Sequence, residues 1–171
     1  MRRPGESGRR ARGGRGLAAL SWGLAGVLLS LDQLSKLWAL RELEPGWVTP
    51  FLPGLLQLRL VRNTGAAFSL LSGSTPLLAL ISVGVCLAVA GFLWRRPPAT
   101  ASLALALGFL LGGAAGNGLD RWRLGAVIDF LEFVPFPFPV FNLADVAINL
   151  AVFCFALDWL AGQRRQGERD A

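Results

Sequence analysis

The chain contains no histidine and no tyrosine among its 171 residues. Without histidine, its own side chains cannot build a Ser-His-Asp triad, a Cys-His pair, an HExxH zinc site or a histidine proton relay. Cysteine is scarce too, since Cys86 and Cys154 are the two in the sequence, and both lie in apolar stretches. We expect both to be small buried hydrophobes, because nothing favours a disulfide and two thiols make a poor metal site. We therefore expect no metal and no other cofactor.

Charged residues are also few, at 16% of the chain against 53% hydrophobic residues, and the mean hydropathy is +0.50. A soluble domain usually carries about 25% charged residues. A single domain of this size has too much surface to cover with so few charges. The composition excludes an ordinary water-soluble globule and a disordered chain, and it favours a small integral membrane protein.

Four long apolar segments predict a mainly α-helical membrane protein with four transmembrane helices. Each is close to the ~20 residues that a helix needs to cross a hydrocarbon core about 30 Å thick. The runs are too long and too uniform to be the alternating strands of a barrel. The four segments are 17–40, 75–94, 99–119 and 142–160.

The segments 41–74 and 120–141 are expected on the exterior side. Apolar and polar residues alternate from Leu56 to Arg62, which predicts a strand and a small sheet against the membrane surface. The second segment ends in a run that alternates proline with phenylalanine. Proline blocks helix formation, so we expect a semi-rigid flap at the lipid interface.

Arginine is concentrated in residues 1–16, at Arg95 and Arg96, and in residues 161–171. All three groups fall on one side of a four-helix topology, so the positive-inside rule predicts that both termini are cytoplasmic. The net charge of +6 is then a topology signal and not a sign of nucleic-acid binding. We expect a solvated basic tail over 1–16, a membrane domain over 17–160 and a C-terminal tail over 161–171. The first apolar segment has no small-residue cleavage site, so we expect an uncleaved helix.

Four carboxylates lie near the exterior ends of the expected helices: Asp32, Asp120, Asp129 and Asp145. A charged side chain at membrane depth costs roughly 2.5–3.5 kcal/mol, so such groups usually pair, line a wet cavity or take part in catalysis. Two carboxylates brought together can share one proton, one acting as general base and the other as acid. This aspartic-protease chemistry needs neither histidine nor a metal.

Asp129 and Asp145 are the candidates for such a pair. Asp129 lies in an apolar run, where burial would raise its pKa; the alternative is an exposed loop acid. Asn142 is a good N-cap with Asp145 three residues later, so Asp145 could serve only to cap a helix. Asn142, Asp145 and Asn149 share one helix face, which we expect to point into the bundle.

Other polar and small residues have structural interpretations. Asp32 and Lys36 are spaced as an intrahelical ion pair, and Asp120 with Arg121 could belong to a charge network. Asn117 can donate and accept near a site, and Asn63 with Gly65 forms a turn that could contact an extended peptide. The spacing of four between Gly108, Gly112 and Gly116 predicts close helix packing.

Five motifs occur in order along the chain: DQLSK at 32–36, NTGAAF at 63–68, GNGLDR at 116–121, VIDF at 127–130 and FNLAD at 141–145. Together they resemble the lipoprotein signal peptidase family, signal peptidase II, over residues 17–160. The resemblance implies an aspartic endopeptidase of the bacterial inner membrane, with four transmembrane helices and a site at the exterior face. The family removes signal peptides from prolipoproteins, cutting before a diacylglyceryl-modified cysteine.

By the same resemblance, the catalytic pair is Asp129 and Asp145, and Asp32 with Lys36 supports the site. The implied substrate-binding residues are Asn63, Gly65, Asn117, Asp120, Arg121 and Asn142. The expected partners are lipidated prolipoproteins and membrane phospholipids, with no nucleic acid, and the protein is expected to be a monomer. Two other hypotheses remain: an ion-coupled transporter, since intramembrane acids also mark ion paths, and a non-catalytic scaffold.

Overall fold

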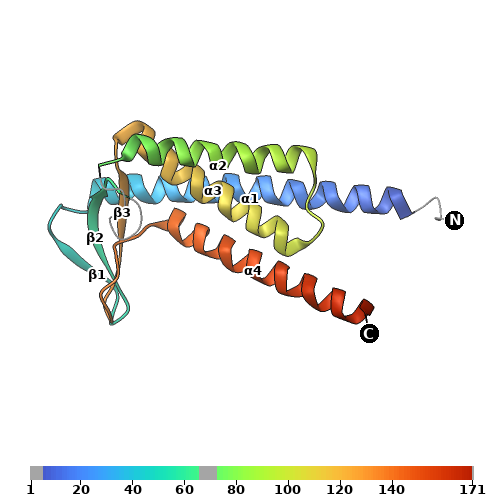
Figure 1. Cartoon of the computed structure of the whole chain (residues 1–171). Helices are drawn as coiled ribbons and strands as arrows, with labels where there is room; N and C mark the ends of the chain where they lie inside the picture. Colours follow the sequence, from blue (N-terminus) through green and yellow to red (C-terminus); the bar gives the residue numbers. More distant parts are fainter. Residues whose placement is uncertain (1–5, 66–72, 171) are drawn as a thin grey trace.

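The computed structural model describes residues 6–65 and 73–170 and contains four helices with a small sheet across one end (Figure 1). The elements in chain order are α1 (Glu6–Glu42), β1 (Val48–Leu52), β2 (Leu56–Asn63), α2 (Thr75–Arg95), α3 (Ala101–Leu124), β3 (Val127–Phe133) and α4 (Leu143–Asp170). All four helices are long and apolar enough to cross a membrane. The prediction of a four-helix membrane protein with a small sheet is confirmed, and the protein is a multi-pass membrane protein.

Three helix boundaries differ from the predicted ones by five residues or more, and the others agree to within two residues. Helix α1 begins at Glu6, so it extends through residues 6–16 of the predicted basic tail. Helix α3 continues to Leu124, and α4 continues to Asp170. The prediction ended each helix where the apolar run ended. Arginine, glutamine and alanine are good helix formers in water, so backbone hydrogen bonding continues beyond the apolar part.

Helix α3 is the centre of the bundle and contacts α1, α2 and α4. The glycines of α3 allow the three neighbouring helices to approach it closely. A Cβ at Gly112 would lie 3.0 Å from the Ala25 carbonyl oxygen of α1, and one at Gly113 only 2.6 Å from the Ala144 carbonyl oxygen of α4. A Cβ at Gly118 would lie 2.8 Å from Cβ of Ser82 on α2. The predicted close packing through glycine is confirmed, because small residues let helix backbones approach in a membrane.

The sheet is antiparallel with the strand order β1-β2-β3. The alternating segment forms β2 as predicted, and the tight turn into it contains Gly54 with φ of 75°. Strand β3 was not predicted. Its first five residues are all buried, so it lacks the alternation that reveals a strand with one exposed face. In the register of the sheet, Asp129 lies opposite Val61.

The segment that follows β3 folds back on it. Phe141 exchanges backbone hydrogen bonds of 2.8 Å with Leu131, and its ring lies 5.1 Å from that of Phe133. Phe136 and Phe138 extend this aromatic group and are exposed on their outer sides. The segment thus packs against itself. Its position at the lipid interface stays a prediction.

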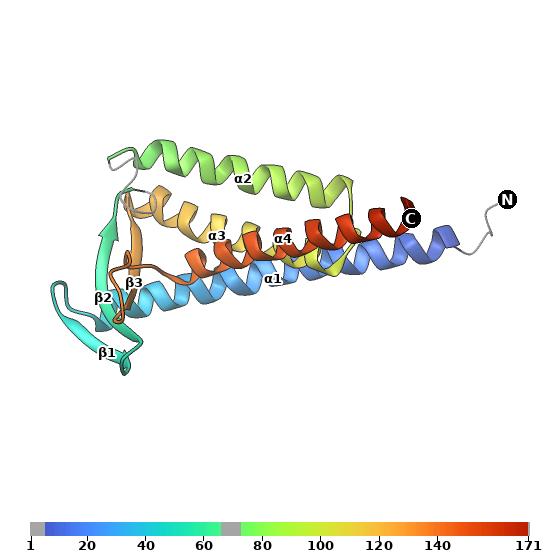
Figure 2. The ribbon, with the colours of Figure 1, turned by 60° about the horizontal axis from the view of Figure 1, so that its bottom comes forward.

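The sheet is fixed to the helices by an apolar joint. Ala39 of α1 is buried with Leu58, Phe130 and Leu131, and the rings of Trp38 and Phe130 meet edge to face. Figures 1 and 2 show that this joint lies at the end of the bundle away from both chain ends. The end of α3, the start of α4 and strand β3 converge there.

Candidate active site

The start of α4 is organised by a reciprocal cap. The side-chain oxygen of Asn142 accepts a hydrogen bond of 2.9 Å from the backbone N–H of Asp145. In return, Oδ2 of Asp145 accepts one of 3.2 Å from the backbone N–H of Asn142. This geometry is that of a capping box, and it confirms the predicted N-cap. It also fixes the Asp145 carboxylate at the first turn of the helix.

Asn142 joins the two candidate acids. Its side-chain Nδ2 donates a hydrogen bond of 2.6 Å to Oδ1 of Asp129, while its backbone N–H is bonded to Asp145. Asn142 is fully buried, and Asp129 is 2% exposed. Asn142 therefore hydrogen-bonds to two acids that come from separate elements, Asp129 from strand β3 and Asp145 from helix α4.

Asn117 of α3 completes the contacts to Asp145. Its Nδ2 donates to Oδ1 of Asp145 at 2.8 Å, and its Oδ1 accepts from Nδ2 of Asn142 at 3.0 Å. Lys36 also donates to that oxygen, at 2.9 Å. These two donors set the orientation of the Asn117 amide, because its oxygen must face them and its nitrogen must then face Asp145.

Asn63 contacts the other acid from the end of β2. Its Nδ2 donates a hydrogen bond of 3.0 Å to Oδ2 of Asp129, and its side-chain oxygen accepts one of 2.9 Å from the N–H of Gly65. The Gly65 carbonyl in turn accepts a hydrogen bond of 3.0 Å from Arg121. The turn predicted at Asn63 and Gly65 is thus present, and it connects the sheet to α3. The rest of the motif, 66–68, lies outside the described residues.

The pKa of Asp129 is raised from 3.8 to about 7, first by burial and then by the nearby charge of Asp145. The hydrogen bonds from Asn63 and Asn142 and the charge of Lys36 oppose the rise. The expectation of a raised pKa in an apolar run agrees with this result. A carboxyl group that gains or loses its proton near neutral pH is suited to acid-base chemistry.

A buried cation lies behind the two acids. Nζ of Lys36 is 2.8 Å from Oδ2 of Asp32 and 3.0 Å from Oδ2 of Asp120, and all three side chains are buried. The predicted pair of Asp32 and Lys36 is therefore present, but Asp120 takes part as well. Asp120 joins a charge network, although its ion-pair partner is Lys36 and not the neighbouring Arg121.

Sequence reasoning missed several contacts at this end of the bundle. Gln33 donates to Oδ1 of Asp120 at 3.0 Å and to Oδ2 of Asp32 at 3.2 Å. Its position beside Asp32 in the DQLSK motif was the available signal.

The expectation for Asn149 was wrong, because its side chain is exposed and donates to the backbone oxygen of Asp145.

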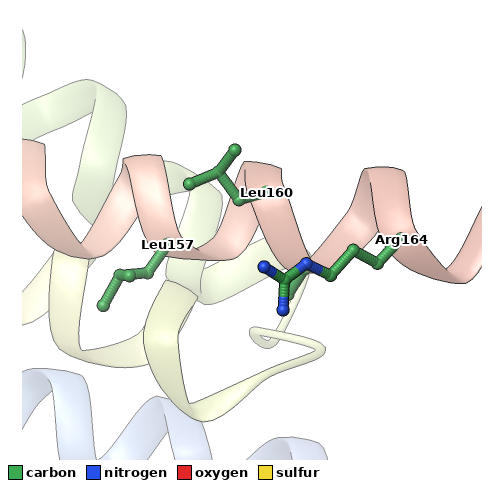
Figure 3. A pocket seen from close by; sticks show the side chains of 4 residues that line it. Leu157, Leu160 and Arg164 are labelled. Carbon is green, nitrogen blue, oxygen red and sulfur yellow. The ribbon is translucent and has the colours of Figure 1, made fainter.

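A cavity of about 420 Å³ lies on α4 far along the helix from these acids. Its lining residues are Leu157, Leu160, Ala161 and Arg164 (Figure 3). The lining is apolar apart from one arginine and offers no carboxylate. The candidate active site is therefore the acid cluster at the sheet end and not this cavity.

Comparison with known proteins identifies the family of the chain. A family model described as "Signal peptidase (SPase) II" matches residues 24–161. A lipoprotein signal peptidase of Parasynechococcus marenigrum is 51% identical over 80% of this chain and 86% of its own length. A lipoprotein signal peptidase of a Synechococcus species is 55% identical over 78% of this chain and 89% of its own length.

Solved structures of similar fold are also membrane proteins. A bacterial membrane enzyme determined by the in meso method has a TM-score of 0.78 and 27% identity, covering 84% of this chain and 88% of that one. The region that the family model matches contains α2, α3, the sheet and the parts of α1 and α4 that hold the acid cluster. The chain belongs to the signal peptidase II family.

Proposed function

We propose that this protein is an aspartic endopeptidase that removes the signal peptide from diacylglyceryl-modified prolipoproteins, cutting before the lipidated cysteine. Asp129 and Asp145 are its catalytic pair. Family membership supports the processing of prolipoproteins. The observation that carries the aspartic mechanism is that one residue, Asn142, donates from its side-chain amide to Asp129 and from its backbone N–H to Asp145.

The pair would work by sharing one proton. The raised pKa of Asp129 favours a state in which one of the two acids is protonated near neutral pH. The ionised carboxylate accepts a proton from the attacking water. The protonated one donates its proton to the carbonyl oxygen, which gives a tetrahedral diol. The acid that took the proton from water then donates it to the leaving nitrogen as the C–N bond breaks, and the other carboxylate takes a proton back from the diol, so the pair again holds one proton. No cofactor is needed for these steps.

Arg121 is suited to hold the substrate. Its guanidinium bonds to the Gly65 carbonyl, and its buried Nε has no hydrogen-bond partner among the described residues. A buried donor without a partner is costly, so a carbonyl group of an extended peptide would satisfy it. Asn63 and Gly65 line the same approach from β2, and strand β1 pairs with β2 only as far as Arg59. We infer that an extended substrate segment lies along Leu60–Asn63.

The membrane explains why a lipidated substrate fits. The spanning part of α4, Leu143–Arg164, has 22 residues and is about 33 Å long, so it separates Asp145 from Arg164 by the thickness of a hydrocarbon core. We propose that the arginine-rich ends lie in the cytoplasm and the acids at the exterior surface of the inner membrane. Acyl chains anchored in that leaflet then hold the modified cysteine near the acids and raise its local concentration.

The test compares Asp129→Asn and Asp145→Asn with the unchanged protein on a diacylglyceryl-modified precursor and its unmodified twin. Each substitution should lower the cleavage rate by about 10²–10⁴-fold, and only the modified precursor should be cut. Glu132→Gln is the matched control, because this acid lies on β3 but pairs with exposed Arg59. Cleavage at the normal rate by either aspartate variant would contradict the mechanism.

The transporter hypothesis receives no comparable support. The four predicted acids gather at the end of the bundle that the sheet covers, and they do not continue along it. An ion path needs polar groups through the membrane. The scaffold hypothesis predicts that replacing both catalytic acids leaves function intact, so the same two variants test it.

A further inference from the structure

We propose that Asp32, Lys36 and Asp120 form a clamp that positions the two catalytic acids, by holding the backbone immediately before each of them. This inference deepens the proposed function and rests on it. The three residues do not contact the substrate. They are positioning residues that act through the chain segments carrying Asp129 and Asp145.

The clamp is visible in two backbone contacts. Oδ2 of Asp120 accepts a hydrogen bond of 3.1 Å from the N–H of Ile128, the residue before Asp129. Oδ1 of Asp32 accepts one of 3.0 Å from the N–H of Ala144, the residue before Asp145. Each supporting acid thus holds the element that carries one catalytic acid.

Lys36 connects the two halves. Its ammonium group lies 2.8 Å from the Asp32 carboxylate and 3.0 Å from that of Asp120. It also donates to Asn117, whose amide bonds to Asp145. One buried cation therefore fixes the acceptors for β3 and for α4 at the same time. An ion pair of this kind sets geometry more than it adds stability.

Burial makes the arrangement rigid. Lys36 is 2% exposed, Asp32 is 1% and Asp120 is 3%, so water does not compete for their hydrogen bonds. Gly116 provides the room, because a Cβ there would lie 2.5 Å from Oδ2 of Asp32. A shift of either carboxylate would move the adjoining backbone. Catalysis is sensitive to such shifts, since a misplacement of about 1 Å can cost 10²-fold in rate.

The first experiment measures amide hydrogen exchange in full-length protein in detergent, for Asp120→Ala and Asp32→Ala. The clamp predicts a crossed result. Asp120→Ala should lower the protection of the Ile128 amide by at least about tenfold and leave the Ala144 amide protected, and Asp32→Ala should do the reverse. This readout does not depend on peptidase activity. Equal loss of protection at both amides in each variant would overturn the clamp even if the proposed function holds.

The second experiment measures cleavage of the lipidated precursor and its pH profile. Asp120→Ala should lose at least about tenfold in kcat, and Asp120→Asn should lose less, because asparagine keeps an acceptor for the Ile128 N–H. Gly108→Ala is the control. It also disturbs the packing of α1 against α3, but near Ser21 and away from the clamp. It should lower thermal stability and leave kcat unchanged for the folded fraction.

Lys36→Met and Lys36→Arg complete the test. The cations facing the catalytic pair are Arg121 and Lys36, and Asp120 is paired with Lys36. The charge of Lys36 opposes the raised pKa of Asp129. Lys36→Met should therefore move the upper limb of the pH profile to higher pH, and Lys36→Arg should restore it. If Lys36→Met lowers only the amount of folded protein, with the same kcat and pH profile, Lys36 is merely structural and the inference fails. Inactivity of the unchanged protein on the precursor would instead refute the proposed function.

Discussion

The side-chain nitrogen of Asn142 lies 2.6 Å from Oδ1 of Asp129, a short hydrogen bond that crosses from helix α4 to strand β3. Asn142 is the residue through which the two acids are connected, and its amide can donate to a carboxylate whether or not the neighbouring acid is protonated. The first prediction follows from this contact.

Asn142→Ala should lower cleavage of the lipidated precursor by about 10–100-fold, because a hydrogen bond to a charged group contributes roughly 1.5–3 kcal/mol. Loss of the cap at the start of α4 should also cost about 1 kcal/mol of unfolding free energy. Both effects are measured on purified protein, by a cleavage assay and by thermal unfolding. Asn149→Ala serves as the control, since that side chain is exposed on the same helix. A normal rate for Asn142→Ala would show that the bridge is dispensable.

The pH dependence of activity is the second prediction. Because the pKa of Asp129 is about 7, the shared proton is lost as the pH rises above neutrality. Cleavage should therefore fall along a limb centred near pH 7. The profile is measured as kcat/KM from pH 5 to 9 on the lipidated precursor. An unchanged rate up to pH 9 would contradict a shared proton on this residue.

The same group predicts how stability depends on pH. The folded pKa of about 7 exceeds the ordinary value of 3.8, so between these values the folded protein binds a proton that the unfolded chain does not. The stabilisation is complete below about pH 4 and is lost as the pH rises through 7. Asp129→Asn should remove this dependence and stabilise the protein at pH 8, by roughly 4 kcal/mol at most. Thermal unfolding of both proteins at pH 5 and pH 8 measures the difference.

A fourth prediction concerns the glycines of α3. Gly116→Ala should destabilise the protein by about 1–3 kcal/mol, because the new methyl group would meet the Asp32 carboxylate, and overpacked cores lose this much. Gly26→Ala is the matched control, since nothing lies within 4 Å of a Cβ at that position. That substitution should be neutral or slightly stabilising, as alanine favours helix over glycine. If both variants unfold at the same temperature, α3 is less tightly packed than the distances indicate.

The parts of this fold that depend on local rules could be predicted from the sequence. Membrane-spanning segments follow from length and hydropathy, and the cap at Asn142 and Asp145 follows from a spacing of three residues. The prediction of Asp32 with Lys36 also used a local spacing, one helical turn. In each case, the chemistry of neighbouring residues is sufficient to determine the contact.

The remaining contacts could not be predicted because they join distant parts of the chain. Lys36 and Asn117 are 81 residues apart, and the bond from the Ala144 amide to Asp32 spans 112 residues. No local spacing reveals such a pair. Strand β3 lacked alternation because both of its faces are covered, and Asn149 was misplaced because a shared helix face is only an approximate guide to burial.

The two turns that enter the sheet offer different opportunities for labelling the protein. Gly125 ends α3 with φ of 68°, and β3 begins only two residues later. The connection is therefore too short to absorb extra residues without moving β3. An insertion there would displace Ile128 from Asp120 and carry Asp129 with it. The turn at Gly54 is exposed and joins β1 to the start of β2, whereas Asn63, which contacts Asp129, is the last residue of β2. A short epitope or fluorophore attachment sequence inserted at Gly54 should therefore be tolerated and leave the acid cluster undisturbed.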